Sequence, residues 1–172
     1  MMYICKKMII MTRIITSILL LFLVINTATS QINQETKLTT GEPIKLKFTG
    51  VTITPPKDYH YMEDISSFMN RDRETSISVT TNDSISYYLM VGAILRSDFS
   101  GQETKLLSKE QVPGKLGIIF VFLFKVQGIN VERMVYVTGD DRSSVSISAN
   151  YKQSDKAAVI DELKKSILSV EF

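Results

Sequence analysis

The chain has a single histidine, His60, which limits the acid–base chemistry that the sequence can support. Histidine changes its charge near neutral pH, so hydrolytic triads and many proton-transfer sites depend on it. His60 lies between Tyr59 and Tyr61, and the nearby carboxylates are Asp58 and Glu63. A histidine paired with one of these carboxylates would suit a hydrolase or another enzyme of small ligands, which stays an open alternative. The favoured interpretation is a surface or partly packed histidine at the rim of a sheet.

Two other charged clusters have simple structural interpretations. Residues 71–74 contain Arg71 and Arg73, which could bind an anion, but alternating charges are also typical of a solvated strand edge. Asp140 and Asp141 could attract a cation, but calcium needs about six to eight oxygen ligands and no ladder of spaced acidic residues surrounds them. The sequence also has no phosphate-binding glycine loop, nucleophile elbow or dinucleotide motif. We therefore predict no catalytic residues, no cofactor and no metal site.

The first 30 residues have the three parts of a secretory signal. A basic segment ends at Arg13, an apolar stretch runs from Ile14 to Ile25, and small residues precede a cleavage point after Ser30. The apolar stretch has 12 residues, whereas a membrane-spanning helix needs about 20. We predict a signal peptide over residues 1–30 and a protein that is periplasmic or secreted. A retained N-terminal membrane anchor is the alternative.

The leader also accounts for the basic charge of the chain. The 172 residues include 20 Lys and Arg against 18 Asp and Glu, but three of the basic residues lie in the leader, which leaves the other 142 residues with a net charge of −1. A nearly neutral body argues against nucleic acid as a partner. The only cysteine, Cys5, also lies in the leader, so the body has no thiol for a disulfide, a zinc site or catalysis. A body of this size can be held together by its hydrophobic core.

After the leader, we predict a flexible N-terminal arm over residues 31–43 and a single domain over residues 44–172. The connection over residues 57–74 is the longest, and loops frequently carry binding residues. We place a candidate partner-binding surface there, next to the start of the first helix. Its residues are Tyr59, His60, Tyr61, Arg71 and Arg73.

Two helices are predicted from apolar residues that recur at three- and four-residue steps. The first extends from Ile85 to Phe99 after a cap at Asp83 or Ser84, and the second covers residues 155–170. Tyr87 to Met90 is more apolar than one buried helix face requires, so this run is either core or an adaptable surface for a partner. Strands are predicted over residues 44–48, 51–54, 76–80, 104–111, 116–126, 131–137 and 144–151.

Two of these strands indicate the architecture. Ile118 to Phe124 is apolar without alternation, so we expect both of its faces to be covered. Residues 144–151 alternate between polar and apolar, so we expect full cover on one face only. The prediction is an α+β fold, a three-layer α/β/α sandwich with a mainly antiparallel central sheet flanked by helices.

The order of elements over residues 48–172 resembles the PsbP-like superfamily, which includes the Mog, PsbP and DcrB types. The resemblance lies in a strand that enters a proline–aromatic turn at residues 51–59, a strand and long helix, a meander that closes at residues 139–141, and a last helix that ends at residues 166–172. It implies an α/β/α sandwich that works by binding, without catalytic residues.

Within that superfamily, the exported DcrB-like type agrees best with the leader. The resemblance therefore implies a non-enzymatic accessory protein that binds an unknown protein or a component of the cell envelope. A secretion-linked chaperone is a further alternative, and the oligomeric state is open.

Overall fold

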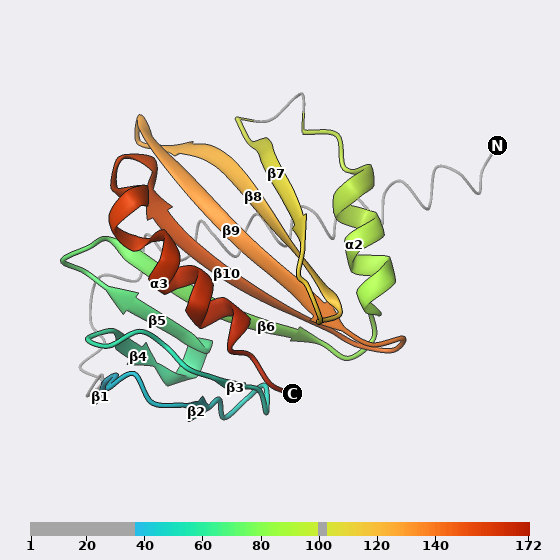
Figure 1. Cartoon of the computed structure of the whole chain (residues 1–172), viewed down its shortest axis with the longest axis horizontal. Helices are drawn as coiled ribbons and strands as arrows, with labels where there is room; N and C mark the ends of the chain where they lie inside the picture. Colours follow the sequence, from blue (N-terminus) through green and yellow to red (C-terminus); the bar gives the residue numbers. More distant parts are fainter. Residues whose placement is uncertain (1–36, 100–102) are drawn as a thin grey trace. The chain divides into compact units, whose positions relative to one another are not determined.

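An eight-stranded antiparallel sheet is the centre of the fold (Figure 1). Two meanders, β4 to β6 and β7 to β10, meet where β6 pairs with β10, and the strand order is β1-β4-β5-β6-β10-β9-β8-β7. The strands are β1 (Lys37–Leu38), β4 (His60–Met62), β5 (Ser67–Asn70), β6 (Thr75–Asn82), β7 (Lys105–Gln111), β8 (Gly117–Val126), β9 (Ile129–Gly139) and β10 (Ser144–Lys152). A separate two-stranded sheet consists of β2 (Ile44–Lys45) and β3 (Thr52–Ile53).

The computed structural model describes residues 37–99 and 103–172. The predicted signal peptide and the first residues of the predicted arm lie outside the described residues. In the described part of the arm, β1 pairs with β4, and Thr39 is buried with its backbone N–H donating to the carbonyl oxygen of Tyr59 at 2.8 Å. No helix in the described part of the chain is long and apolar enough to cross a membrane.

The turn between β8 and β9 lies in the gap between the two strands that the sequence predicts there. Val126 pairs directly with Ile129, and the two residues between them, Gln127 and Gly128, have φ values of 51° and 83°. Positive φ at both positions is typical of the tight turns that match the twist of paired strands. The predicted antiparallel meander is confirmed.

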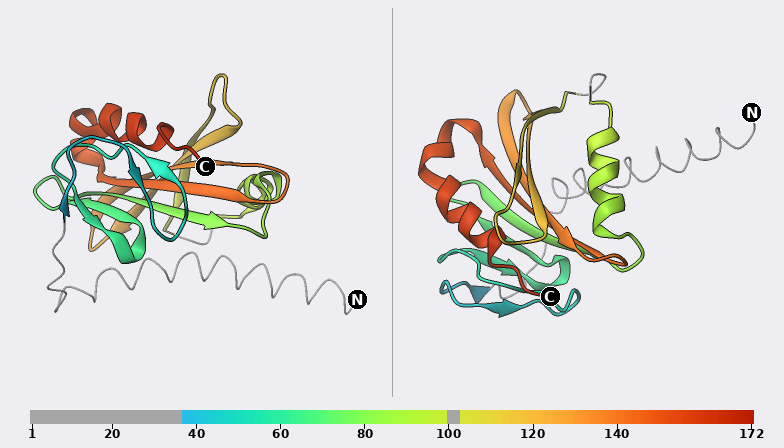
Figure 2. Two further views of the ribbon diagram at one scale, coloured as in Figure 1. Left: turned by 90° about the horizontal axis from the view of Figure 1, so that it is seen from below. Right: turned by 45° about the vertical axis from the view of Figure 1, so that its right-hand side comes forward.

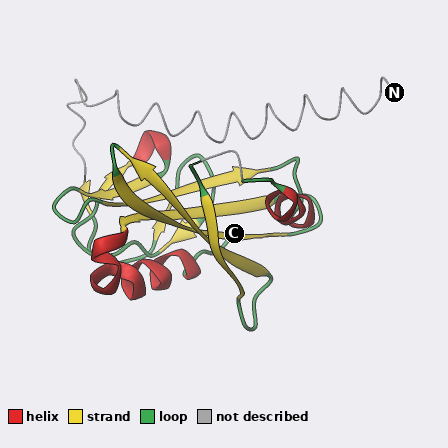
Figure 3. Ribbon diagram, turned by 90° about the horizontal axis from the view of Figure 1, so that it is seen from above, coloured by secondary structure: helices red, strands yellow, loops and turns green. Residues whose placement is uncertain are grey.

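Each side of the sheet carries its own hydrophobic cluster. Helix α3 (Lys156–Leu168) buries Val159, Leu163 and Ile167 in the main core, on the side that we call the α3 side. Helix α2 (Tyr87–Arg96) buries its residues in a smaller cluster with Phe120 of β8, on the opposite side, which we call the α2 side. Figures 2 and 3 show the two helices far apart, with strands between them.

The α+β class and the antiparallel sheet are confirmed, but cover on the α2 side is limited. Phe120 is fully buried, whereas Phe122 and Phe124 of the same strand are only half-buried. The expectation that residues 118–124 are covered on both faces is therefore wrong for the second half of the strand, because α2 has only ten residues. The alternation of β10 is confirmed: Val145 and Ile147 are buried, whereas Ser146 is half-buried.

The connection predicted over residues 57–74 is not an irregular loop. It contains β4, a short 3-10 helix (Glu63–Ile65) and β5, and β5 pairs with β6. Asp58, Ser66 and Glu74 have φ values of 64°, 47° and 50°. These are left-handed conformations that sequence rules assign to glycine, so the corners of this segment carry no clear signal in the sequence.

Helix α2 is shorter than predicted at both ends. Ser86, rather than Asp83 or Ser84, is the N-cap, and its Oγ accepts a hydrogen bond from the backbone N–H of Leu89 at 3.3 Å. The carbonyl oxygen of Asp140 accepts from the N–H of Tyr87 at 2.9 Å, which fixes the start of the helix against the β9–β10 turn. The helix ends at Arg96, whereas the prediction extends to Phe99.

Candidate partner-binding surface

The structure separates the three aromatic residues that were predicted to share a binding surface. Tyr59 is fully buried in the main core, so it cannot contact a partner, and its hydroxyl lies 2.6 Å from Oγ1 of Thr75. Tyr61 points to the α3 side and stacks on Phe68 with ring centroids 4.9 Å apart. His60 alternates with them and therefore lies on the α2 side of β4, half-buried.

Tyr59→Phe tests the structural role of the buried hydroxyl. Burial raises the pKa of Tyr59, and its hydroxyl forms a hydrogen bond with Thr75 inside the core. We expect the variant to lose about 1 kcal/mol of unfolding free energy, because Oγ1 of Thr75 loses this partner. Urea denaturation followed by circular dichroism measures the change. The exposed Tyr88→Phe is the control, and an equal effect of both variants would contradict the structural role.

The two predicted arginines lie in the turn between β5 and β6. Arg73 donates from Nη1 to Oε2 of Glu162 in α3 at 2.6 Å, which ties it to the α3 side. Arg71 is exposed in the same turn. Of the five predicted residues, one is buried in the core, one lies on each side of β4, and two lie in the turn between β5 and β6. They therefore do not form one cluster.

A different surface arises on the α2 side, where β6 and β10 lie next to each other. Besides the terminal pair of Asn82 with the buried Ser144, the residues there form three direct cross-strand pairs, Ser76 with Asn150, Ser78 with Ser148, and Thr80 with Ser146. Five of these side chains are half-buried and Thr80 is exposed. We call this array of six residues the polar face. The sequence signal for it is the strict alternation of β6 and β10, whose apolar partners all point to the α3 side.

Arg133 of β9 borders the polar face and is held by its neighbours. Its Nε donates to Oδ1 of Asn150 at 2.7 Å, and Nδ2 of Asn150 donates to Oγ of Ser76 at 3.0 Å. The guanidinium also lies 4.9 Å from the ring centroid of Phe124, a cation–π contact. Burial lowers the pKa of Arg133 to about 9. Sequence reasoning missed this residue because the neighbours that orient it come from other strands.

The outer surface of α2 is apolar. Tyr88, Leu89 and Leu95 are 60%, 61% and 45% exposed, whereas Tyr87 and Met90 are buried. The two interpretations of this run, core and adaptable surface, therefore each describe part of it. Scattered apolar residues are common on protein surfaces, and a ten-residue helix presents only a small area.

The acidic pair after β9 stabilises a turn. Oδ1 of Asp140 accepts hydrogen bonds from the backbone N–H groups of Arg142 and Ser143, both at 2.7 Å. These bonds lower the pKa of Asp140. A shallow hollow of about 400 Å³ lies beside the turn, lined by Leu116, Asp140, Asp141 and Arg142. Because the Asp140 carboxylate is engaged by its own turn, the hollow has no converging set of ligands.

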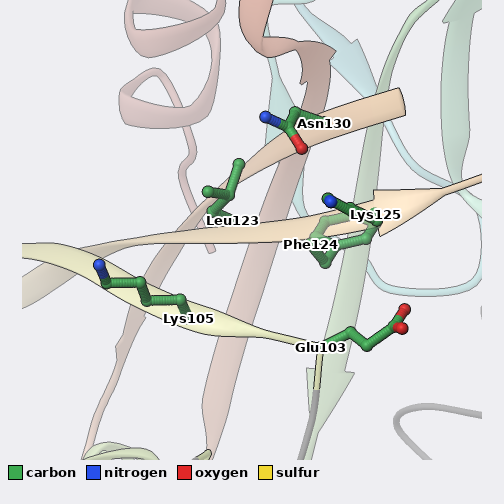
Figure 4. A pocket seen from close by; sticks show the side chains of 6 residues that line it. All are labelled: Glu103, Lys105, Leu123, Phe124, Lys125 and Asn130. Atoms are coloured by element: carbon green, nitrogen blue, oxygen red, sulfur yellow. The ribbon is translucent and has the colours of Figure 1, made fainter. Parts of the chain in front are cut away.

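A second hollow of about 280 Å³ lies at the start of β7, the end of β8 and the start of β9 (Figure 4). Its lining mixes one carboxylate with two ammonium groups, so it favours no single ligand charge. In Figure 4 the charged ends of Glu103 and Lys105 point away from each other. The lining residues are Glu103, Lys105, Leu123, Phe124, Lys125 and Asn130.

One buried carboxylate, Glu132, was not singled out from the sequence. It is 2% exposed and accepts hydrogen bonds from Tyr151 Oη at 2.9 Å, Lys156 Nζ at 2.8 Å and Gln153 Nε2 at 3.1 Å. The network connects β9 and β10 with the start of α3, so its role is to hold these elements together. Within residues 37–99 and 103–172, no cluster of three or more His, Cys, Asp or Glu could hold a metal ion.

Comparison with known proteins shows the fold. No protein-family model and no curated protein matches the chain. Cyanobacterial PsbP (CyanoP) from Synechocystis sp. PCC 6803 is 11% identical, with a TM-score of 0.54 over 83% of this chain and 98% of that chain. The Saccharomyces cerevisiae Ran-binding protein Mog1p is 11% identical, with a TM-score of 0.52 over 77% and 95%.

Mycobacterium tuberculosis LpqN, described as involved in cell envelope biogenesis, is 10% identical, with a TM-score of 0.48 over 80% of this chain and 91% of that chain. The chain has the fold of CyanoP and Mog1p, so the resemblance inferred from the order of elements is confirmed for the fold. At these identities the likeness transfers no binding residue and no partner.

Proposed function

We propose that this chain is an exported, non-enzymatic accessory protein that binds another protein through the polar face. The observation that carries the proposal is the array of six hydroxyl and amide side chains on β6 and β10, which neither described helix buries as core. Polar side chains fixed on a rigid sheet suit recognition, because little side-chain freedom is lost when a partner binds.

The comparisons support binding as the mode of action. Mog1p, which has the same fold, is a Ran-binding protein. Export is supported by the leader sequence, whose basic, apolar and small-residue parts follow in the order of a signal peptide. His60, on the α2 side of β4, extends the proposed surface at its margin.

Site-specific cross-linking tests this function. In a Cys5→Ser background the chain has no other thiol, so Ser78→Cys places a single photo-cross-linker on the polar face. Asp161→Cys places the same reagent on the exposed surface of α3 as the matched control. We expect an envelope extract of the source organism to give one defined protein adduct from position 78 and none from position 161. No adduct at either position, or the same adduct at both, would contradict the proposal.

A further inference from the structure

Carboxylates are distributed unequally between the two sides of the sheet. The described strands contain only two, Glu110 of β7 and Glu132 of β9, and both lie on the α3 side. Glu110 pairs with Lys164 of α3 at 2.9 Å, and Glu132 pairs with Lys156. Among the described strand residues, the α2 side has no carboxylate at all.

Positive side chains do occur on the α2 side. Lys109, Arg133 and Lys152 occupy positions on it in β7, β9 and β10. Glu74, in the turn before β6, forms an ion pair with Lys152 at the rim. The two sides therefore differ in charge, and the α2 side is complementary to a negatively charged partner.

Arg133 lies on β9, directly beside Asn150 of the polar face. The strand register places Arg133, Asn150, Ser76, Met69 and His60 in one row across five strands. The hydrogen bond to Asn150 and the contact with the Phe124 ring fix the guanidinium in place. A fixed, partly buried arginine binds a carboxylate more strongly than a mobile surface lysine does, because less freedom is lost and water screens the charges less.

The chemistry of the face argues against two other occupants. A second copy that used the same surface would bring the positive side chains of both copies together, which is unfavourable. Nucleic acid binding depends on neutralising many phosphates, and the body has a net charge of −1 after the leader is removed.

The serine and threonine hydroxyls of the polar face can donate hydrogen bonds to carboxylate oxygens.

We infer that the partner presents an acidic protein segment, whose carboxylates lie on the polar face around Arg133. This inference rests on the proposed function and specifies the chemistry of the partner. Its main contact is a carboxylate at the Arg133 guanidinium, with further hydrogen bonds from the hydroxyls of β6 and β10.

Peptide titration followed by ¹⁵N–¹H NMR tests the inference on protein purified from cells that express the full chain. The probe is a soluble peptide rich in glutamate, and its control has glutamine at every glutamate position. We expect the glutamate peptide to shift the amide signals of Ser76, Ser78 and Ser148. The glutamine peptide should bind at least about tenfold more weakly.

Substitutions at several positions test whether the glutamate peptide binds at the polar face. Arg133→Gln is expected to weaken binding of the glutamate peptide by about tenfold or more, and Arg133→Lys by less. Ser78→Glu and Ser78→Gln both remove a hydroxyl of the polar face, but only glutamate adds a repelling charge, so Ser78→Glu should weaken binding more than Ser78→Gln does. Lys47→Gln is the control for a general loss of charge, because Lys47 is exposed on the segment between β2 and β3.

The inference would be overturned by equal binding of the two peptides, by shifts confined to another surface, or by preferential binding of a DNA duplex at the polar face. A second copy at the face would appear as concentration-dependent shifts without peptide and would overturn it as well. If position 78 cross-links to a protein but the glutamate peptide fails these tests, the acidic chemistry is wrong while the proposed function stands. If the cross-link also fails, both are wrong.

Discussion

Phe120→Ala is expected to lower the unfolding free energy by about 3–5 kcal/mol, the largest effect of any substitution considered for this chain. Phe120 is fully buried and packs in one cluster with Tyr87, Met90 and Val91 of α2 and with Val137 of β9. Removal of its ring leaves a cavity between the helix and the sheet, and a ten-residue helix has few other contacts to hold it.

Urea denaturation measures the loss of stability, and hydrogen exchange of the α2 amides locates it. We expect the α2 amides to exchange faster than those of β10 in the variant, because the cavity opens under the helix. Leu89→Ala is the matched control, since Leu89 belongs to α2 but is 61% exposed, and its effect should stay within about 0.5 kcal/mol. A loss below about 1 kcal/mol for Phe120→Ala would mean that this cluster does not anchor the helix.

The second meander and both helices could be predicted from the sequence because their signals are local. Each signal comes from one element or turn. Examples are the alternation of polar and apolar residues in 144–151, the turn residue Gly128, and the spacing of apolar residues in α3. Such patterns follow directly from the geometry of strands and helices. The structure shifts the boundaries of these elements by only a few residues.

The segment over residues 57–74 could not be predicted in the same way. Its strands, β4 and β5, have only three and four residues, and β5 exists because it pairs with β6. Its corners use left-handed Ser66 and Glu74, where the sequence contains no glycine. The partner-binding residues predicted there were separated for the same reason, because a strand places successive side chains on opposite sides of a sheet.

Only part of the candidate site could be predicted from the sequence. Ser146 and Ser148 of β10 lie on the less covered face, as the alternation predicted, whereas Ser144 at the start of the strand is buried. The row that Arg133 forms with Asn150 and Ser76 depends on the register of three strands. A shift of one residue would move Arg133 to the other side of the sheet, so its role follows from tertiary structure alone.

Glu132 had a signal in the sequence, since alternation in β9 places it on the same side as the core residues Met134 and Tyr136. A carboxylate at such a position must be paired, because an unpaired buried charge is costly. Burial alone would raise the pKa of Glu132, but hydrogen bonds from Lys156, Tyr151 and Gln153 outweigh burial and lower the pKa below its usual value of 4.5. The ionised form is therefore the one that the folded protein stabilises.

Glu132→Ala is accordingly expected to lower the unfolding free energy at pH 7 by about 2–4 kcal/mol, because the buried Tyr151 hydroxyl loses its acceptor and a cavity remains. Glu132→Gln keeps the size and one acceptor, so it should cost only about 1–2 kcal/mol. The lowered pKa means that the stabilisation by the carboxylate is complete above pH 4.5 and is lost as the pH falls further. In urea denaturation between pH 7 and pH 3, the stability difference between wild type and Glu132→Gln should therefore narrow below pH 4.5, and a constant difference would show that the charge of Glu132 does not stabilise the fold.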